Sequence, residues 1–99
     1  MPLRIRRGAR ARSDQSAIWF YIASDNMAAA DRQMDRLHDA FLMLSDYPEA
    51  GRVRVEVDAQ LRTFPIDQYL IFYRVSPGVL EIVRILHAAR DITADLLSD

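Results

Sequence analysis

The sequence lacks lysine and cysteine altogether. Its 13 basic residues are all arginine, which excludes Schiff-base catalysis by lysine and the lysine of a phosphate-binding loop. Without cysteine the chain has no disulfide, no thiolate nucleophile and no cysteine-ligated zinc, so nothing in it requires an oxidising compartment. We therefore expect a cytoplasmic protein.

Long hydrophobic runs are missing too. Apolar runs such as Tyr69–Tyr73 are far shorter than the roughly 20 residues of a membrane-spanning helix. Residues 1–12 carry five arginines and no acid, but no apolar stretch or cleavage site typical of a secretory signal. Three glycines, four prolines and 51% hydrophobic residues are ordinary for a globular chain. We expect one domain over residues 1–99 and no membrane partner.

The first half of the chain predicts a strand and two helices. Leu3–Arg6 alternates apolar and charged residues, as a strand with one buried face does. The spacing then becomes helical from about Ala9 to Ser24. Asn26 is suited to cap a second helix, which ends before Tyr47–Gly51 because Pro48 lacks an amide hydrogen. The apolar stripe of this second helix is Ala30, Met34, Leu37, Phe41 and Leu44.

The second half predicts strands. Val53–Asp58 alternates valine with charged residues, which fits an exposed strand or an extended connection. Three further strands are predicted over Leu61–Phe64, where Pro65 stops the strand, over Tyr69–Val75 and over Val79–Leu86. A turn at Ser76–Gly78 separates the last two, and short connections make the three an antiparallel meander.

The last predicted strand has apolar residues on both faces, so we expect it to be central. Alternation places Leu80, Ile82 and Leu86 on one face and Val83 and Ile85 on the other. Asp91 is then a possible cap of a short helix through Leu97. The order β-α-α-β-β-β-(α) predicts an α+β fold with two helices on one face of a small, mainly antiparallel sheet.

Metal chemistry has little support in the sequence. Asp35 and His38 are spaced like half of a di-iron site, but such a site needs a second copy that the chain lacks. A solvated helix face, with Arg36 paired to Asp39 three residues on, accounts for the same residues. We assign no metal and no cofactor.

Candidate functional residues gather around the last strand. His87, with Arg84 before it and Arg90 after it, could perform general acid-base work on RNA, or could serve a structural role in the loop. Arg62, Arg74 and Arg84 lie in predicted strands, where unpaired burial is costly. They either form one basic patch that grips oxyanions or pair with acids such as Glu81 and Asp91.

Three consecutive aromatic residues cannot all lie on one helix stripe. Tyr21 fits the core row with Ile18 and Ile22, which leaves Trp19 or Phe20 facing outward. An outward aromatic side chain is either a protein-binding anchor or is covered by the C-terminal segment.

A set of motifs in fixed order spans Arg6 to Leu97. They are Asp14-x-x-x-Ile18-x-x-Tyr21-Ile22, Leu44-x-x-Tyr47-Pro48-x-x-Gly51-Arg52, Arg62, Tyr69-Leu-Ile-Phe-Tyr-Arg74 and Ile82-Val-Arg84-Ile-Leu-His87-Ala-Ala-Arg90-Asp91. In this the chain resembles the ParE toxins of type II toxin–antitoxin modules. It departs from them at Gln15, where the family usually has leucine.

The resemblance implies a ParE/RelE-type fold, growth inhibition by blocking DNA gyrase, and a hetero-oligomer with a ParD-like antitoxin. Such an antitoxin has an N-terminal ribbon-helix-helix domain, through which alone the complex would contact DNA, and an amphipathic C-terminal segment. The related RelE toxins instead cleave mRNA on the ribosome with lysines, arginines and a late tyrosine. Here lysine is absent, and no tyrosine follows Asp91. We therefore expect a non-enzymatic toxin. The alternatives are a RelE-type ribonuclease and a degenerate toxin that only binds its antitoxin.

No catalytic residue is assigned. The candidates for contacting the target, which match the family pattern by position, are Arg62, Tyr69, Arg74, Arg84, His87, Arg90 and Asp91. The candidates for contacting the antitoxin are Trp19, Phe20, Leu42, Arg4 and Arg6.

Overall fold

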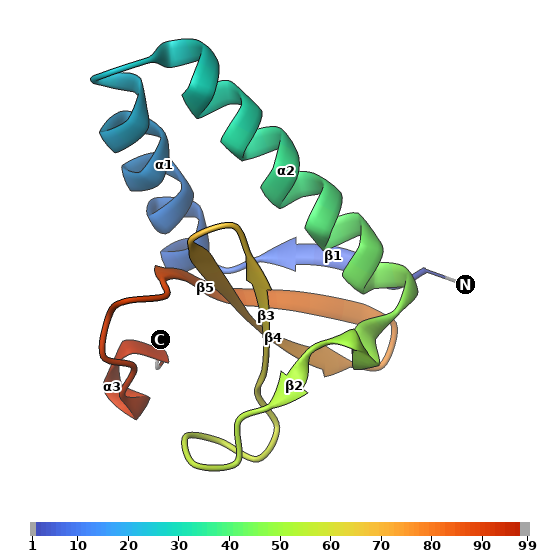
Figure 1. The fold of residues 1–99 in the computed structure, drawn as a ribbon. Coiled ribbons are helices and arrows are strands. Elements are labelled where there is room, and N and C mark those ends of the chain that lie inside the picture. The colour runs from blue at the N-terminus through green and yellow to red at the C-terminus, as the bar shows by residue number, and fades with distance from the viewer. Residues whose placement is uncertain (1, 98–99) are drawn as a thin grey trace.

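A computed structural model describes residues 2–97 and has the predicted α+β architecture (Figure 1). Its elements are β1 (Arg4–Arg7), α1 (Ala9–Ala23), α2 (Met27–Asp46), the 3-10 turn η1 (Pro48–Ala50), β2 (Arg52–Val53), β3 (Arg62–Ile66), β4 (Tyr69–Ser76), β5 (Val79–His87) and α3 (Ala94–Leu97). The sheet order is β1-β5-β4-β3-β2. Only the β1–β5 pair is parallel, and the central position predicted for the last strand is confirmed.

The helical pair forms as the sequence predicts. The Asn26 side chain caps α2 by accepting a hydrogen bond from the Ala29 N–H at 3.0 Å. The stripe of α2 buries Leu37, Phe41 and Leu44 completely or nearly so. No helix within residues 2–97 combines the length and the apolar composition needed to cross a bilayer.

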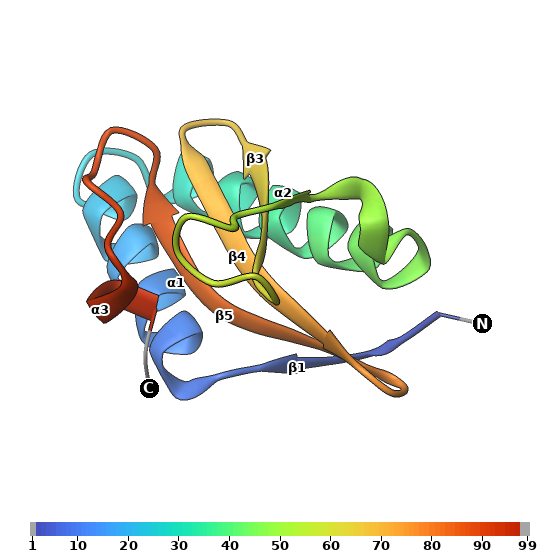
Figure 2. The ribbon, with the colours of Figure 1, turned by 90° about the horizontal axis from the view of Figure 1, so that it is seen from below.

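Each face of the sheet has its own core. The helical pair covers one face, and its core includes Phe41, Ile71 and Ile82. On the opposite face, Phe72 and Val83 pack beneath the segment before β3 and the C-terminal segment that ends in α3 (Figure 2). Because both faces are covered, β4 and β5 read as almost continuous apolar runs.

The β4–β5 ladder contains one register shift, which the predicted alternation of side chains did not include. Phe72 pairs with Arg84, whereas the next residue, Tyr73, pairs with Ile82. Val83 is therefore an extra residue in the ladder, and it shifts the following side chains by one face. The predicted faces of Ile85 and Leu86 were wrong for this reason: Ile85 joins the core under the helices and Leu86 joins the opposite one.

Three other predicted boundaries differ. β3 continues through Pro65 because β2 pairs only as far as Thr63, so the missing N–H falls on an open edge. Of Val53–Asp58 only the first residue is in a strand. Asp91 does not cap α3, which begins at Ala94.

Asp67 connects the β3–β4 turn to α2. Its carboxylate accepts two hydrogen bonds from Arg36, at 2.7 and 2.8 Å, and one from Gln33 at 3.1 Å. The Arg36 guanidinium lowers the pKa of Asp67 for this reason. Arg36 therefore makes its hydrogen bonds to Asp67, which the sequence did not predict, while the charge of the predicted partner Asp39 also raises the Arg36 pKa.

The loop after α2 is held by a buried tyrosine. Tyr73 Oη donates to the Pro48 carbonyl at 2.7 Å and accepts from the Gly51 N–H at 2.8 Å. Arg62 donates to the Gly51 carbonyl at 2.7 Å. A Cβ atom at Gly51 would lie 2.3 Å from Tyr73 Oη, so only glycine fits. These contacts explain the glycine of the Tyr47-Pro48-x-x-Gly51 motif, because the Tyr73 hydroxyl holds the loop at Pro48 and Gly51.

We predict that Tyr73→Phe lowers the free energy of unfolding by about 1–3 kcal/mol, because two buried polar groups lose their partner. Gly51→Ala lowers it by a similar amount, about 1–3 kcal/mol, because the ring or the loop must move. Urea denaturation measures both changes. Tyr47→Phe is the matched control, since the Tyr47 side chain is exposed. An equal loss of unfolding free energy in that control would show that the Tyr73 hydrogen bonds do not hold the loop.

Candidate functional site

The far end of β5 has no neighbouring strand on the β1 side. β1 ends at Arg7, and the Gly8 N–H makes the last bond of this edge, to the Ile82 carbonyl at 3.0 Å. The chain then turns into α1, which carries Asp14. The Asp14 carboxylate accepts a hydrogen bond from the Ile85 N–H at 2.9 Å. A side chain therefore provides the hydrogen-bond partner that β1, which ends at Arg7, cannot provide to this part of β5.

The same carboxylate holds Arg84. Its two oxygens accept from Arg84 Nε at 2.7 Å and Nη2 at 2.8 Å. The side chains of Arg84 and Asp14 are only 7% and 13% exposed. The hydrogen bonds from Arg84 to Asp14 raise the arginine pKa more than burial lowers it. The remaining terminal nitrogen donates to the Leu96 carbonyl at 2.5 Å, which fixes the C-terminal segment.

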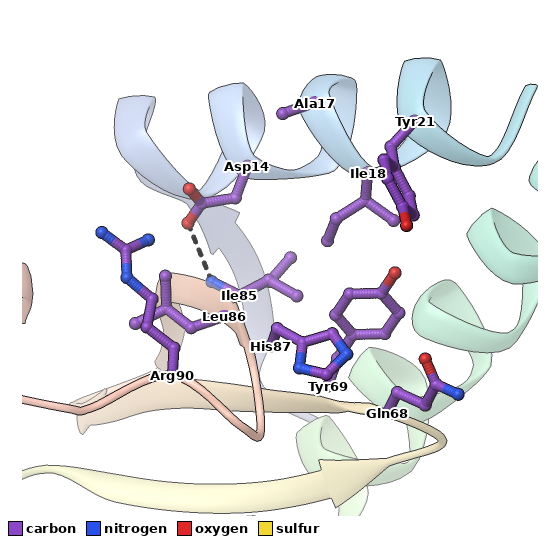
Figure 3. A pocket seen from close by; sticks show the side chains of 10 residues that line it. All are labelled: Asp14, Ala17, Ile18, Tyr21, Gln68, Tyr69, Ile85, Leu86, His87 and Arg90. Carbon is purple, nitrogen blue, oxygen red and sulfur yellow. Dashed lines mark hydrogen bonds between the residues drawn. The ribbon is translucent and has the colours of Figure 1, made fainter. Parts of the chain in front are cut away.

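A groove of about 360 Å³ lies beside this ion pair, between α1 and the ends of β4 and β5. It is lined by Asp14, Ala17, Ile18, Tyr21, Gln68, Tyr69, Ile85, Leu86, His87 and Arg90. Figure 3 shows Ile18 and Tyr21 facing the groove from α1, with the Tyr69 hydroxyl directed toward them from the sheet. His87 and Gln68 lie beside Tyr69, and Arg90 lies near the Asp14 end.

The groove has apolar walls and a rim of hydrogen-bond donors. The His87 and Tyr69 rings meet edge to face with their centroids 5.7 Å apart. Burial raises the pKa of Tyr69 and keeps its hydroxyl protonated. His87 Nδ1 accepts the Ala89 N–H at 3.1 Å, so in the neutral ring Nε2 carries the proton. With the Arg90 guanidinium, these groups suit an apolar side chain followed by a carboxylate.

The structure separates the arginines that the sequence had grouped. Arg84 belongs to the ion pair with Asp14 and not to a cluster with His87. The predicted pairing of a strand arginine with Glu81 is confirmed for Arg74, but Arg84 pairs with neither Glu81 nor Asp91. Arg74 contacts Asp58 at 3.1 Å and Glu81 at 4.0 Å. Arg62, which holds the loop after α2, lines a second hollow together with Arg74. One patch of all three arginines does not form, because Arg84 faces α1.

The remaining candidates occupy several surfaces. Tyr21 is 79% exposed and lines the groove, so its predicted core position was wrong. Phe20 is 69% exposed, as predicted for an outward aromatic, whereas Trp19 is half-buried and donates to Asp31 at 2.9 Å. Exposed Leu42 lies near the C-terminal end of α2, whereas Phe20 lies near the C-terminal end of α1. The two other candidates, Arg4 and Arg6, lie on β1, and Asp91 is exposed after β5.

Sequence reasoning missed the partnership of Asp14 and Arg84 because 70 residues separate them. One signal was present: an arginine inside a predicted central strand needs a buried acid. It also missed Gln68 and Ile18 as groove residues. Gln68 lies at the groove because its neighbour Tyr69 pairs with His87, and this pairing is known only from the register of β4 and β5.

Comparison with known proteins gives a consistent result. Residues 5–92 match the family model described as the ParE toxin of the type II toxin–antitoxin system parDE. The chain is 42% identical to Toxin RelE2 of Caulobacter vibrioides over 81 residues, which is 82% of this chain and 90% of that protein. It is 30% identical to Toxin ParE3 of the same organism over 73 residues, 74% of this chain and 73% of that protein.

Two solved structures share the fold. A chain of the chromosomal ParDE toxin–antitoxin system from P. aeruginosa has a TM-score of 0.73 at 18% identity, covering 86% of this chain and 95% of that one. A chain of the RelBE2 toxin–antitoxin complex from Mycobacterium tuberculosis has a TM-score of 0.65 at 23% identity, covering 88% and 99%.

We predict that Asp14→Ala lowers the free energy of unfolding by about 3–5 kcal/mol, because it strands a buried guanidinium. That loss approaches the about 5–15 kcal/mol that typically stabilises a whole domain. Chemical denaturation measures it against Asp35→Ala, an exposed aspartate on α2. Equal stability of the two variants would show that the ion pair does not hold α1 to β5.

Proposed function

The chain belongs to the family of ParE toxins of type II toxin–antitoxin systems, and we propose that it inhibits growth by binding DNA gyrase without catalysis. An antitoxin of the ParD type neutralises it in the cytoplasm by direct binding. The family match supports the toxin role, and the chemistry of the groove supports action by binding.

The observation that carries this proposal is the commitment of Arg84 to Asp14. Cleavage of RNA by acid-base catalysis needs a base, an acid and a cation that converge on one phosphate. Arg84 is buried and bidentate to Asp14, so it is unavailable to a phosphate. Among the described residues that line the groove, His87 is the one histidine, and the one carboxylate is already paired.

The groove is better suited to a protein surface. Its walls are Ile18, Ile85 and Leu86, and two tyrosines and a histidine border them. Aromatic and arginine side chains around an apolar pocket are typical of the residues that dominate protein–protein binding. Of the seven target candidates, Tyr69, His87 and Arg90 line this groove, and we propose these three as target contacts.

Ribonuclease action is the second candidate function. His87 and Arg90 line the same groove, so a proton-transfer group and a cation lie on one surface. The similarity to the relative named Toxin RelE2 also supports this alternative. Mapping mRNA ends after induced expression separates the two functions. New ends at ribosomal positions that disappear with His87→Ala would replace the gyrase proposal.

We predict that the purified chain inhibits supercoiling by gyrase and that Arg90→Ala and Tyr21→Ala weaken the inhibition at least about tenfold, because both remove groove side chains. Tyr47→Ala, an exposed aromatic outside the groove, leaves it unchanged. Normal supercoiling at an excess of folded wild-type chain would exclude gyrase as the target. Unimpaired growth on expression without the antitoxin would favour the third possibility, a degenerate toxin.

A further inference from the structure

The outer edge of β1 carries unused backbone groups. β1 is the first strand of the sheet order, so no strand of the described chain lies on its other side. The N–H groups of Arg4 and Gly8 donate to carbonyls on the β5 side, at 2.9 and 3.0 Å. Because strand backbone groups alternate in direction, those of Ile5 and Arg7 point away from the sheet.

The two ends of this edge are already closed. Leu3 has the same outward direction, and its N–H donates to the Ser45 carbonyl at the end of α2, at 2.9 Å. Beyond Arg7 the chain turns into α1. The open part is therefore the N–H and C=O of Ile5 and of Arg7, enough for a short strand to add by hydrogen bonding.

The edge is strongly basic. The exposed arginines at and next to it are Arg4, Arg6, Arg7, Arg10 and Arg12, with no acidic residue among residues 1–12. Leu3 and Ile5 pack into the core under the helices, so Arg4 and Arg6 project on the opposite face of the sheet. Arg6 approaches Glu81 at 3.6 Å, but Glu81 also faces Arg74 at 4.0 Å.

Charge decides what can pair with this edge. A second copy of β1 would bring an identical row of arginines alongside, and such like-charge pairing is how natural sheets block edge-to-edge association. An extended segment with acidic side chains at alternate positions would meet Arg4 and Arg6 on one face of the sheet. Its backbone would satisfy Ile5 and Arg7.

We infer that the β1 edge is the site where an acidic extended segment of the antitoxin adds to the sheet as a sixth strand. The inference rests on the proposed neutralisation by an antitoxin, and it places two of the antitoxin candidates, Arg4 and Arg6, at this edge. Nucleic acid would use the arginines, but it has no peptide backbone to pair with Ile5 and Arg7. The peptide is therefore the better match.

The test compares two substitutions at one position. Arg7→Pro and Arg7→Ala both remove the exposed side chain and its bond to Gln15, but only proline removes the outward N–H and places a ring on the edge. The probe is a purified ParD-type antitoxin that neutralises the wild-type chain, titrated against the purified full chain by calorimetry. We expect Arg7→Pro to bind at least about tenfold more weakly than Arg7→Ala.

Charge is tested separately. Arg4→Gln with Arg6→Gln should weaken binding about three- to tenfold at low salt and less at high salt, whereas Arg52→Gln on the opposite edge strand β2 should not. Hydrogen exchange gives a readout independent of affinity: the antitoxin should protect the amides of Ile5 and Arg7.

Each result has one meaning. Equal affinity of the two Arg7 variants, with no protection at Ile5, would overturn the strand-addition site while leaving antitoxin neutralisation intact. If the wild-type chain binds no antitoxin, both the proposed neutralisation and this inference fall. Binding of a single-stranded RNA oligonucleotide that is lost with the Arg4 and Arg6 changes, while the antitoxin is unaffected, would assign the edge to nucleic acid instead.

Discussion

The bidentate ion pair between Asp14 and Arg84 is the interaction on which the rest of the structure depends. It exists because β5 is longer than its neighbour β1 and would otherwise leave the Ile85 N–H and a central arginine buried without partners. One carboxylate on α1 satisfies both groups. Since the arginine also holds the Leu96 carbonyl, helix, sheet and C-terminal segment meet at a single point.

The groove follows from this arrangement. The ion pair brings α1 against the end of β5, and the β4–β5 register places Tyr69 opposite His87 at the same end. The side chains of Tyr69 and His87 line one side of the groove, and Tyr21 lines the other side from α1. Ile18 and Ile85, which also line the groove, belong to the core under the helices. Of the two arginines near this groove, Arg84 is held by Asp14, whereas Arg90 lines the groove beside the apolar walls.

Local patterns predicted what depends on local physics. The stripe of α2 and its cap at Asn26, the strand β1 and the meander β3–β5 were all readable, because periodicity and turn residues specify them. The bulge at Val83 could not be predicted, because odd and even positions of β5 both carry apolar residues, so either strand register buries apolar side chains. The same limit applies to the site. His87 and Arg90 were identified by chain proximity, but Arg84, equally close in sequence, points to another element because of a residue 70 positions away.

The Arg84 guanidinium serves the fold, and we propose that it takes no part in the toxic action. The most direct test is the growth inhibition caused by a chain carrying Asp14→Asn together with Arg84→Gln. This pair is uncharged and keeps an oxygen at position 14 for the Ile85 N–H. If circular dichroism shows the variant folded, we predict that it still arrests growth. A folded variant that no longer arrests growth would contradict a purely structural role of Arg84, because the guanidinium itself would then be required at the target.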